Sequence, residues 1–124
     1  MNNPKFDLED RLLEFSVRVI RVTESMKRFR AANHIADQLL RSGTSPYGDH
    51  GEAEGAESRD DFIHKLKVRD KELSESRHSL RLVQKAALIA KPRLLESLII
   101  EAHELVRIFA SSIRTAQRNG GSII

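Results

Sequence analysis

The sequence predicts an all-α protein, folded as an antiparallel up-down-up-down four-helix bundle. Apolar residues recur at helical spacing through most of the chain, while no convincing strand pattern and no internal repeat is present. The chain has 124 residues, which fits a single domain over 1–124, and its 31% charged and 5% aromatic residues are typical of helical proteins. It contains no cysteine, which excludes disulfides, thiolate metal sites and a cysteine nucleophile.

The first helix is predicted over about residues 7–28. Asp7 suits its N-cap, and the acidic residues that follow suit the positive end of the helix dipole. The apolar residues that predict it are spaced alternately four and three apart: Leu8, Leu12, Phe15, Val19, Val22, Met26 and Phe29.

A second helix begins near residue 30, where a shorter apolar run starts: Ala32, Ile35, Ala36, Leu39 and Leu40. Residues 42–55 then contain four glycines and one proline. A glycine costs roughly 1 kcal/mol and a proline about 3 kcal/mol inside a helix, so local propensity alone predicts a loop. Because tertiary packing can override propensity, a kinked helix through Pro46 stays open.

The third and fourth helices are predicted over about 58–88 and 92–118. Ser58 begins the third helix, with Asp60 and Asp61 in its first turn, and Pro92 fits the first turn of the fourth. Their short connection implies antiparallel neighbours. The third helix has a heptad stripe with two polar members: Phe62, Leu66, Arg69, Leu73, Ser76, Leu80, Val83 and Ala87. The fourth helix has an apolar stripe: Leu95, Leu98, Ala102, Leu105 and Phe109.

Charge is distributed unevenly along the chain. Residues 49–61 hold one basic and six acidic side chains, whereas residues 62–124 hold twelve basic and six acidic ones. On helical wheels the basic residues form outward rows that can follow phosphates, although an ordinary solvated bundle face has similar counts. The predicted nucleic-acid-binding residues are Lys67, Lys71, Arg81 and Lys85 on the third helix and Arg107, Arg114 and Arg118 on the fourth; Arg11, Arg18, Arg21 and Arg28 share a face of the first.

Apolar residues exceed what one bundle needs on the first and fourth helices. This surplus predicts self-association, with packing inside the same subunit as the alternative. The predicted interface residues are Ile99, Val106 and Ile113 on the fourth helix and Leu13, Val17 and Ile20 on the first.

No catalytic, cofactor or metal site is predicted. Glu75 and His78 form one Glu-x-x-His, but a di-iron bundle needs a second, which the sequence lacks. No phosphate loop, dinucleotide fingerprint or Ser/His/Asp arrangement occurs, and no small-molecule substrate is expected. No apolar run approaches the length of a membrane span, and residues 1–10 show no signal peptide, so a cytoplasmic protein is expected.

Residues 41–82 carry a family resemblance. The segments 42–45 (SGTS), 54–58 (EGAES), 61–66 (DFIHKL), 71–73 (KEL) and 75–77 (ESR) resemble the bacterial four-helix-bundle family whose founding members are encoded by intervening sequences of large-subunit ribosomal RNA genes. The resemblance implies a homo-oligomer, a pentamer, without enzymatic activity. It also implies kinship with accessory proteins of diversity-generating retroelements, which bind nucleic acid beside a reverse transcriptase.

The resemblance places the glycine- and proline-containing segment inside the second helix. The chain departs from the family at 46–48 and 50–51, so we predict a helix over about 30–55 with a kink or break near 43–51. The expected function is that of a non-enzymatic, homo-oligomeric scaffold or accessory factor with charge-driven binding of RNA or DNA. The alternative is a structural protein–protein interaction module with no nucleic-acid role, and a metal-dependent bundle enzyme is a weaker one.

Overall fold

The computed structural model describes residues 4–122, with side chains described for 7–51 and 55–119. The chain forms α1 (Pro4–Ser25), α2 (Arg30–Glu54), α3 (Arg59–Lys85), the single 3-10 turn η1 (Pro92–Leu95) and α4 (Glu96–Ser122). Residues 4–122 contain no strand, which confirms the all-α class.

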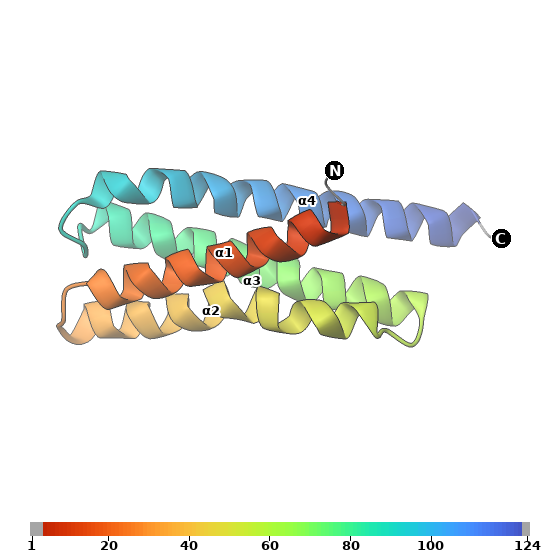
Figure 1. Cartoon of the computed structure of the whole chain (residues 1–124), viewed down its shortest axis with the longest axis horizontal. Helices are drawn as coiled ribbons and strands as arrows, with labels where there is room; N and C mark the ends of the chain where they lie inside the picture. The colour runs from red at the N-terminus through yellow and green to blue at the C-terminus, as the bar shows by residue number, and fades with distance from the viewer. Residues whose placement is uncertain (1–3, 123–124) are drawn as a thin grey trace.

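Helices that follow one another in sequence lie side by side, and α1 also touches α4. In Figure 1, α1 runs toward the end that carries the α1–α2 connection, α2 runs back, and α3 and α4 repeat this reversal. The helix α1 starts part-way along its neighbours. At the opposite end α2, α3 and α4 therefore extend beyond α1, and this end of the bundle is open on one side.

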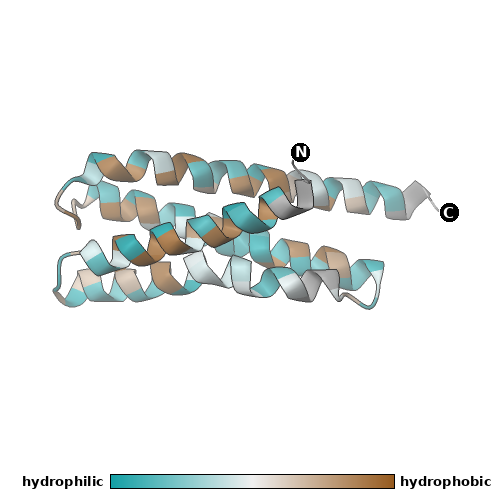
Figure 2. Cartoon of the chain, viewed as in Figure 1, coloured by the Kyte–Doolittle hydropathy of each residue, from teal (hydrophilic) through white to brown (hydrophobic). Residues whose placement is uncertain are grey.

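The core is built from the stripes that the sequence predicts, and Figure 2 shows hydrophobic and hydrophilic residues alternating around each helix. The two polar members of the α3 heptad, Arg69 and Ser76, are buried with the leucines of that stripe. Phe62 and Ala87 are corrections to the predicted stripe, because Phe62 is 38% exposed at the open end and Ala87 is exposed beyond the end of α3. The main buried residues are Leu12, Phe15, Val19, Leu39, Leu73, Leu80, Val83, Leu98, Leu105 and Phe109.

The helix α2 runs without interruption through Pro46, so of the kink or break predicted near 43–51 the break is wrong. Contact with α1 explains why. A Cβ atom built on Gly43 would lie 2.6 Å from Val19 Cγ1, so glycine permits a helix approach that a larger residue would block. Ser16 Oγ on α1 also donates to the Gly43 carbonyl at 3.2 Å. This packing offsets the poor helix propensity of the segment.

The connections differ from prediction by a few residues. The helix α1 ends at Ser25, so Phe29 lies in the following connection and is exposed. At the same end of the bundle, the Lys27 N–H donates to the Leu88 carbonyl at 2.9 Å and joins the two connections there. The predicted start of α3 is confirmed, because Ser58 Oγ accepts from the Asp61 N–H at 3.1 Å.

No helix within residues 4–122 combines the length and the apolar character that a bilayer crossing requires.

Candidate functional site

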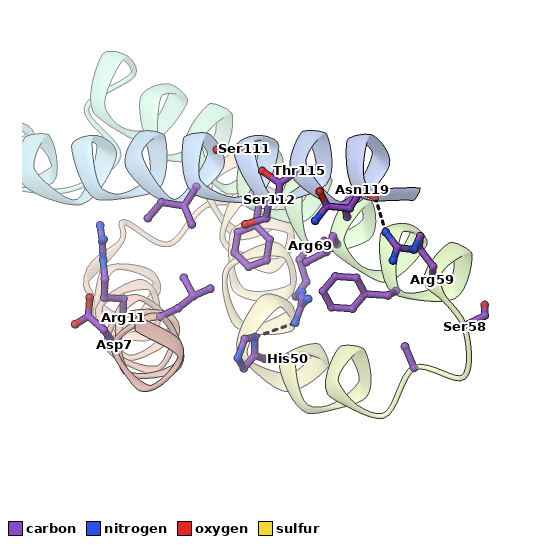
Figure 3. A pocket seen from close by; sticks show the side chains of 17 residues that line it. Asp7, Arg11, His50, Ser58, Arg59, Arg69, Ser111, Ser112, Thr115 and Asn119 are labelled. Carbon is purple, nitrogen blue, oxygen red and sulfur yellow. Dashed lines mark hydrogen bonds between the residues drawn. The ribbon is translucent and has the colours of Figure 1, made fainter. Parts of the chain in front are cut away.

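The open end of the bundle contains a groove with a volume of about 1150 Å³. It lies between the start of α1, the second half of α2, the first half of α3 and the second half of α4 (Figure 3). Its apolar lining includes Leu8, Phe62, Leu66, Ile108 and Phe109. The sequence gives no direct signal for this groove, because it results from the point at which α1 begins relative to its neighbours.

Arg69 and His50 lie at the floor of the groove and point toward one another (Figure 3). Arg69 is 1% exposed, its Nη1 lies 2.9 Å from His50 Nδ1, and its guanidinium carbon lies 5.0 Å from the centre of the Phe109 ring. Since a guanidinium has no acceptor, Nδ1 of His50 accepts this hydrogen bond. The ring of Phe109 adds a cation–π contact, so the buried cation is held from α2 and from α4.

A carboxyl pair joins α2 to α3 close to this floor. Burial, the charge of Asp49, a hydrogen bond with Asp49 and the charge of Glu75 raise the pKa of Glu72 to about 8, while Arg69 opposes the rise. The Glu72 carboxyl is therefore largely protonated at neutral pH. The pKa of the neighbouring Asp70 is also raised, by burial.

Sequence reasoning missed Glu72 as a partner of the α2–α3 contact. Glu75, the glutamate of the Glu-x-x-His segment, is exposed. The missed signal is the spacing of Arg69, Glu72 and Ser76, which puts three polar groups toward α2. Ser76 Oγ, one helical turn from Glu72, donates to Ser42 Oγ at 3.0 Å.

All seven residues predicted to bind nucleic acid are exposed: Lys67, Lys71, Arg81, Lys85, Arg107, Arg114 and Arg118. The arginines that share a face of α1 are not all free of contacts within the chain, because two of them, Arg11 and Arg18, bind α4. Arg11 pairs with Glu101 through bonds of 2.7 and 3.0 Å, and Arg18 Nη2 donates to Ser97 Oγ at 2.8 Å. The pKa of Arg11 is raised mainly by its hydrogen bond to Glu101. This row therefore contributes to helix packing.

The predicted interface residues divide into two groups. Ile99 and Ile113 are 8% exposed and belong to the core of the chain itself, which corrects their prediction as contacts to a second copy. They are buried because α4 packs against α3 along most of its length. Leu13 and Ile20 on α1 are each 42% exposed, while Val17 and Val106 are half-buried.

Among residues with described side chains, no group of three histidine, cysteine, aspartate or glutamate residues has the arrangement of a metal site. His78, the histidine of the Glu-x-x-His segment, is exposed on the outer side of α3.

These features place the protein in the class of all-helical bundle proteins, with a groove at one end and basic residues on its outer faces. Residues 5–111 match the family model described as 23S rRNA-intervening sequence protein. The chain therefore belongs to this family.

A solved structure has the same fold. It is the crystal structure of a protein of unknown function from the S23 ribosomal protein family of Bacteroides thetaiotaomicron VPI-5482. The two chains are 31% identical with a TM-score of 0.75, over 89% of this chain and 97% of that one. A comparison with curated proteins returns no match.

Proposed function

We propose that the protein is a non-enzymatic, cytoplasmic, homo-oligomeric scaffold or accessory factor that binds RNA or DNA through phosphate contacts. The proposal takes the chain as an antiparallel up-down-up-down bundle, which the course of the helices in Figure 1 supports. The single observation that carries it is the exposed basic row on α3, formed by Lys67, Lys71, Arg81 and Lys85.

The geometry of α3 supports a role for this row outside the fold. At 100° per residue, the four cations and His78 lie within an arc of about 80°, opposite the stripe of Leu73, Leu80 and their buried neighbours. The row extends for about 27 Å, since each residue rises 1.5 Å. Its arc contains no acidic residue between Lys67 and Lys85.

Phosphate contacts are the form of binding that such a row favours. It contains no phenylalanine, tyrosine or tryptophan on which bases could stack, so it offers mainly charge and little base recognition. If four phosphates of a duplex are neutralised, log affinity falls against log salt with a slope of about −3.6. That slope corresponds to a loss of about 150-fold between 50 and 200 mM salt.

Self-association would multiply this effect. Leu13 and Ile20 leave an apolar surface on the outside of α1, which supports association with a second copy. Each additional copy repeats the basic row, so several weak contacts can act together on one nucleic acid. The predicted pentamer, and the predicted relationship to retroelement accessory proteins, belong to this proposal.

The test is a variant in which Lys67, Lys71, Arg81 and Lys85 are replaced by Gln. Binding to structured RNA and to duplex DNA is measured as a function of salt by fluorescence anisotropy. We expect weaker binding to every sequence and a flatter salt dependence, with circular dichroism unchanged because all four side chains are exposed.

The matched control removes the same charge from scattered exposed positions, replacing Arg21, Lys27, Arg41 and Lys91 by Gln. It should retain most of the affinity. If the native protein binds neither RNA nor DNA at about 50 mM salt, where phosphate contacts are strong, the nucleic-acid function is refuted. The chain would then act as a protein–protein interaction module, for which the exposed leucine and isoleucine of α1 are the supporting observation.

A further inference from the structure

The basic residues of α3 and those of α4 meet part-way along the bundle. The guanidinium carbon of Arg69 lies 5.0 Å from the centre of the Phe109 ring, so residue 69 of α3 is level with residue 109 of α4. Since the two helices run in opposite directions, Lys71 is level with Arg107. The basic row of α3 therefore reaches the first of the α4 arginines, and the other two lie beyond it toward the open end.

The two sets of cations also lie on the same side of the bundle. On α3, the basic row lies about 180° from Ser76, which bonds to α2, and about 100° from Gln84, which bonds to the start of α4, so it leans toward α4. On α4, the three arginines lie about 120° from Glu101, which binds α1, and so point away from α1. Both sets are thus accessible from the side that α3 and α4 form.

Together these exposed cations form one basic track: Lys67, Lys71, Arg81 and Lys85 of α3 and Arg107, Arg114 and Arg118 of α4. The level of Arg118 corresponds to residue 60 of α3, so the track from Lys85 to that level is about 38 Å long at 1.5 Å per residue. Within residues 7–51 and 55–119, none of the seven side chains forms an ion pair or a hydrogen bond with another side chain. Their charges are therefore available to a ligand.

Acidic side chains interrupt the track little. Asp70 lies between the two sets of cations, where burial raises its pKa and so disfavours its charged form. Glu96 accepts a hydrogen bond from Gln84 at 3.0 Å, and Glu104 lies 3.4 Å from the Arg11 guanidinium, on the α1 side of α4. The exposed acids nearest to the track lie beside it or at one end: Asp60, Glu75, Glu96 and Glu104.

We propose that the basic track binds about one turn of a nucleic-acid double helix, which lies along α3 and crosses onto α4. The inference rests on the nucleic-acid function proposed above and names the form of the ligand and a second set of contacts. Each strand of a duplex has one phosphate per about 3.4 Å, so about 38 Å corresponds to about 11 base pairs, close to one helical turn. A duplex is stiff over this length and matches cations on rigid helices. Single strands are usually held by aromatic stacking, and the track contains no phenylalanine, tyrosine or tryptophan.

The test uses duplexes of about 11 base pairs, as RNA and as DNA, because this length fills one track and is too short to bridge several. Fluorescence anisotropy against salt compares the native chain with the α3 variant described above and with an α4 variant that carries Arg107→Gln, Arg114→Gln and Arg118→Gln. If all seven cations neutralise phosphates, the native slope of log affinity against log salt is about −6.3, and it becomes about −2.7 in the α3 variant and about −3.6 in the α4 variant. Between 50 and 200 mM salt the native chain should lose about 6,000-fold in affinity and the α4 variant about 150-fold.

The matched control replaces three exposed arginines outside the track, Arg21, Arg28 and Arg41, by Gln and should keep nearly the native slope. An α4 variant that behaves like this control, while the α3 variant binds weakly, overturns the track and leaves the proposed function standing. An unstructured single strand of about 11 nucleotides that binds as tightly as the duplex overturns the assignment to a double helix, again without affecting the proposed function. A native chain that binds no nucleic acid at about 50 mM salt refutes both proposals.

Discussion

Arg69 occupies a core position of α3 and keeps its charge there. Burial of an unpaired cation is strongly unfavourable, and the contacts with His50 and Phe109 reduce that cost from two other helices. Around it, Glu72 carries a proton at neutral pH, and Ser76 bonds to Ser42. These polar groups align α2 with α3 at positions where leucine side chains would permit several registers.

Protonation of Glu72 makes stability depend on pH. The pKa of Glu72 in the folded chain, about 8, lies above its unfolded value, so the folded state holds the proton more tightly. Stability should therefore fall as pH rises from about 4.5 to about 8 and then level off. Glu72→Gln should flatten this decline and stabilise the protein at pH 8 by about 1 kcal/mol, allowing for partial solvent screening.

Urea unfolding at several pH values measures this effect. The exposed Glu24→Gln is the control, because it removes one carboxyl group from a different helix without removing a buried one. A variant at residue 72 with the same pH dependence as the native chain would contradict the protonated state of Glu72.

Ala87 follows the end of α3 with φ of 52°, in the left-handed region that favours glycine. The Leu88 N–H donates to the Val83 carbonyl at 2.9 Å across this turn, and Leu88 is buried. Ala87→Gly should stabilise the protein by about 0.5–1 kcal/mol, because it relieves the strain of the Cβ atom. The measurement is the midpoint of chemical unfolding.

The neighbouring residue supplies the control. Ala86 has φ of −82°, which alanine adopts without strain, so Ala86→Gly should lower stability by about 0.5–1 kcal/mol. Equal destabilisation by the two variants would show that the left-handed residue is not strained.

At the scale of elements, the contact between α1 and α2 determines whether residues 43–51 are helical. Local propensity opposes a helix there, and close packing of Gly43 against Val19 favours it. The hydroxyls of Thr44 and Ser45 add bonds of 2.7 Å to the Leu40 and Arg41 carbonyls. The helix therefore persists because its neighbour stabilises it.

Two glycines of α2 should respond oppositely to alanine. Gly43→Ala places a Cβ atom 2.6 Å from Val19 Cγ1 and should destabilise the protein by about 2 kcal/mol. Gly48→Ala meets no atom within 4 Å, so it should stabilise the protein by about 0.5–1 kcal/mol through helix propensity. Thermal unfolding of both variants compares them, and stabilisation by Gly43→Ala would argue against the close α1–α2 approach.

The whole molecule has two kinds of apolar residue, those that complete its own core and those that remain outside. Leu13 and Ile20 remain outside, whereas Ile113 lies within the core. Self-association and folding should therefore respond to different substitutions, although these residues have similar hydrophobicity.

A pair of glutamate substitutions separates the two roles. Ile20→Glu should lower the mass measured by light scattering while circular dichroism stays native, because its side chain is 42% exposed. Ile113→Glu should unfold the chain, since it buries an unpaired charge. A native, fully assembled Ile20→Glu protein would exclude that face of α1 from the interface.

Amino-acid order alone determined the helices, apart from the middle of α2, and most of their inward faces. The spacing of Leu12, Phe15 and Val19, and the heptad from Leu66 to Val83, predict the stripes that the core contains, because helical periodicity is a local property. The exposed basic row on α3 is predictable for the same reason. Its part in nucleic-acid binding stays a prediction.

Only the tertiary structure decided the continuity of α2, the burial of Ile99 and Ile113, and the groove at the open end. Each depends on how far one helix extends along another and how closely the two approach. The carboxyl pair of Asp49 and Glu72 likewise forms only when α2 and α3 meet in one register. Helical periodicity assigns a residue to a face, but it does not state which neighbour covers that face or where the cover ends.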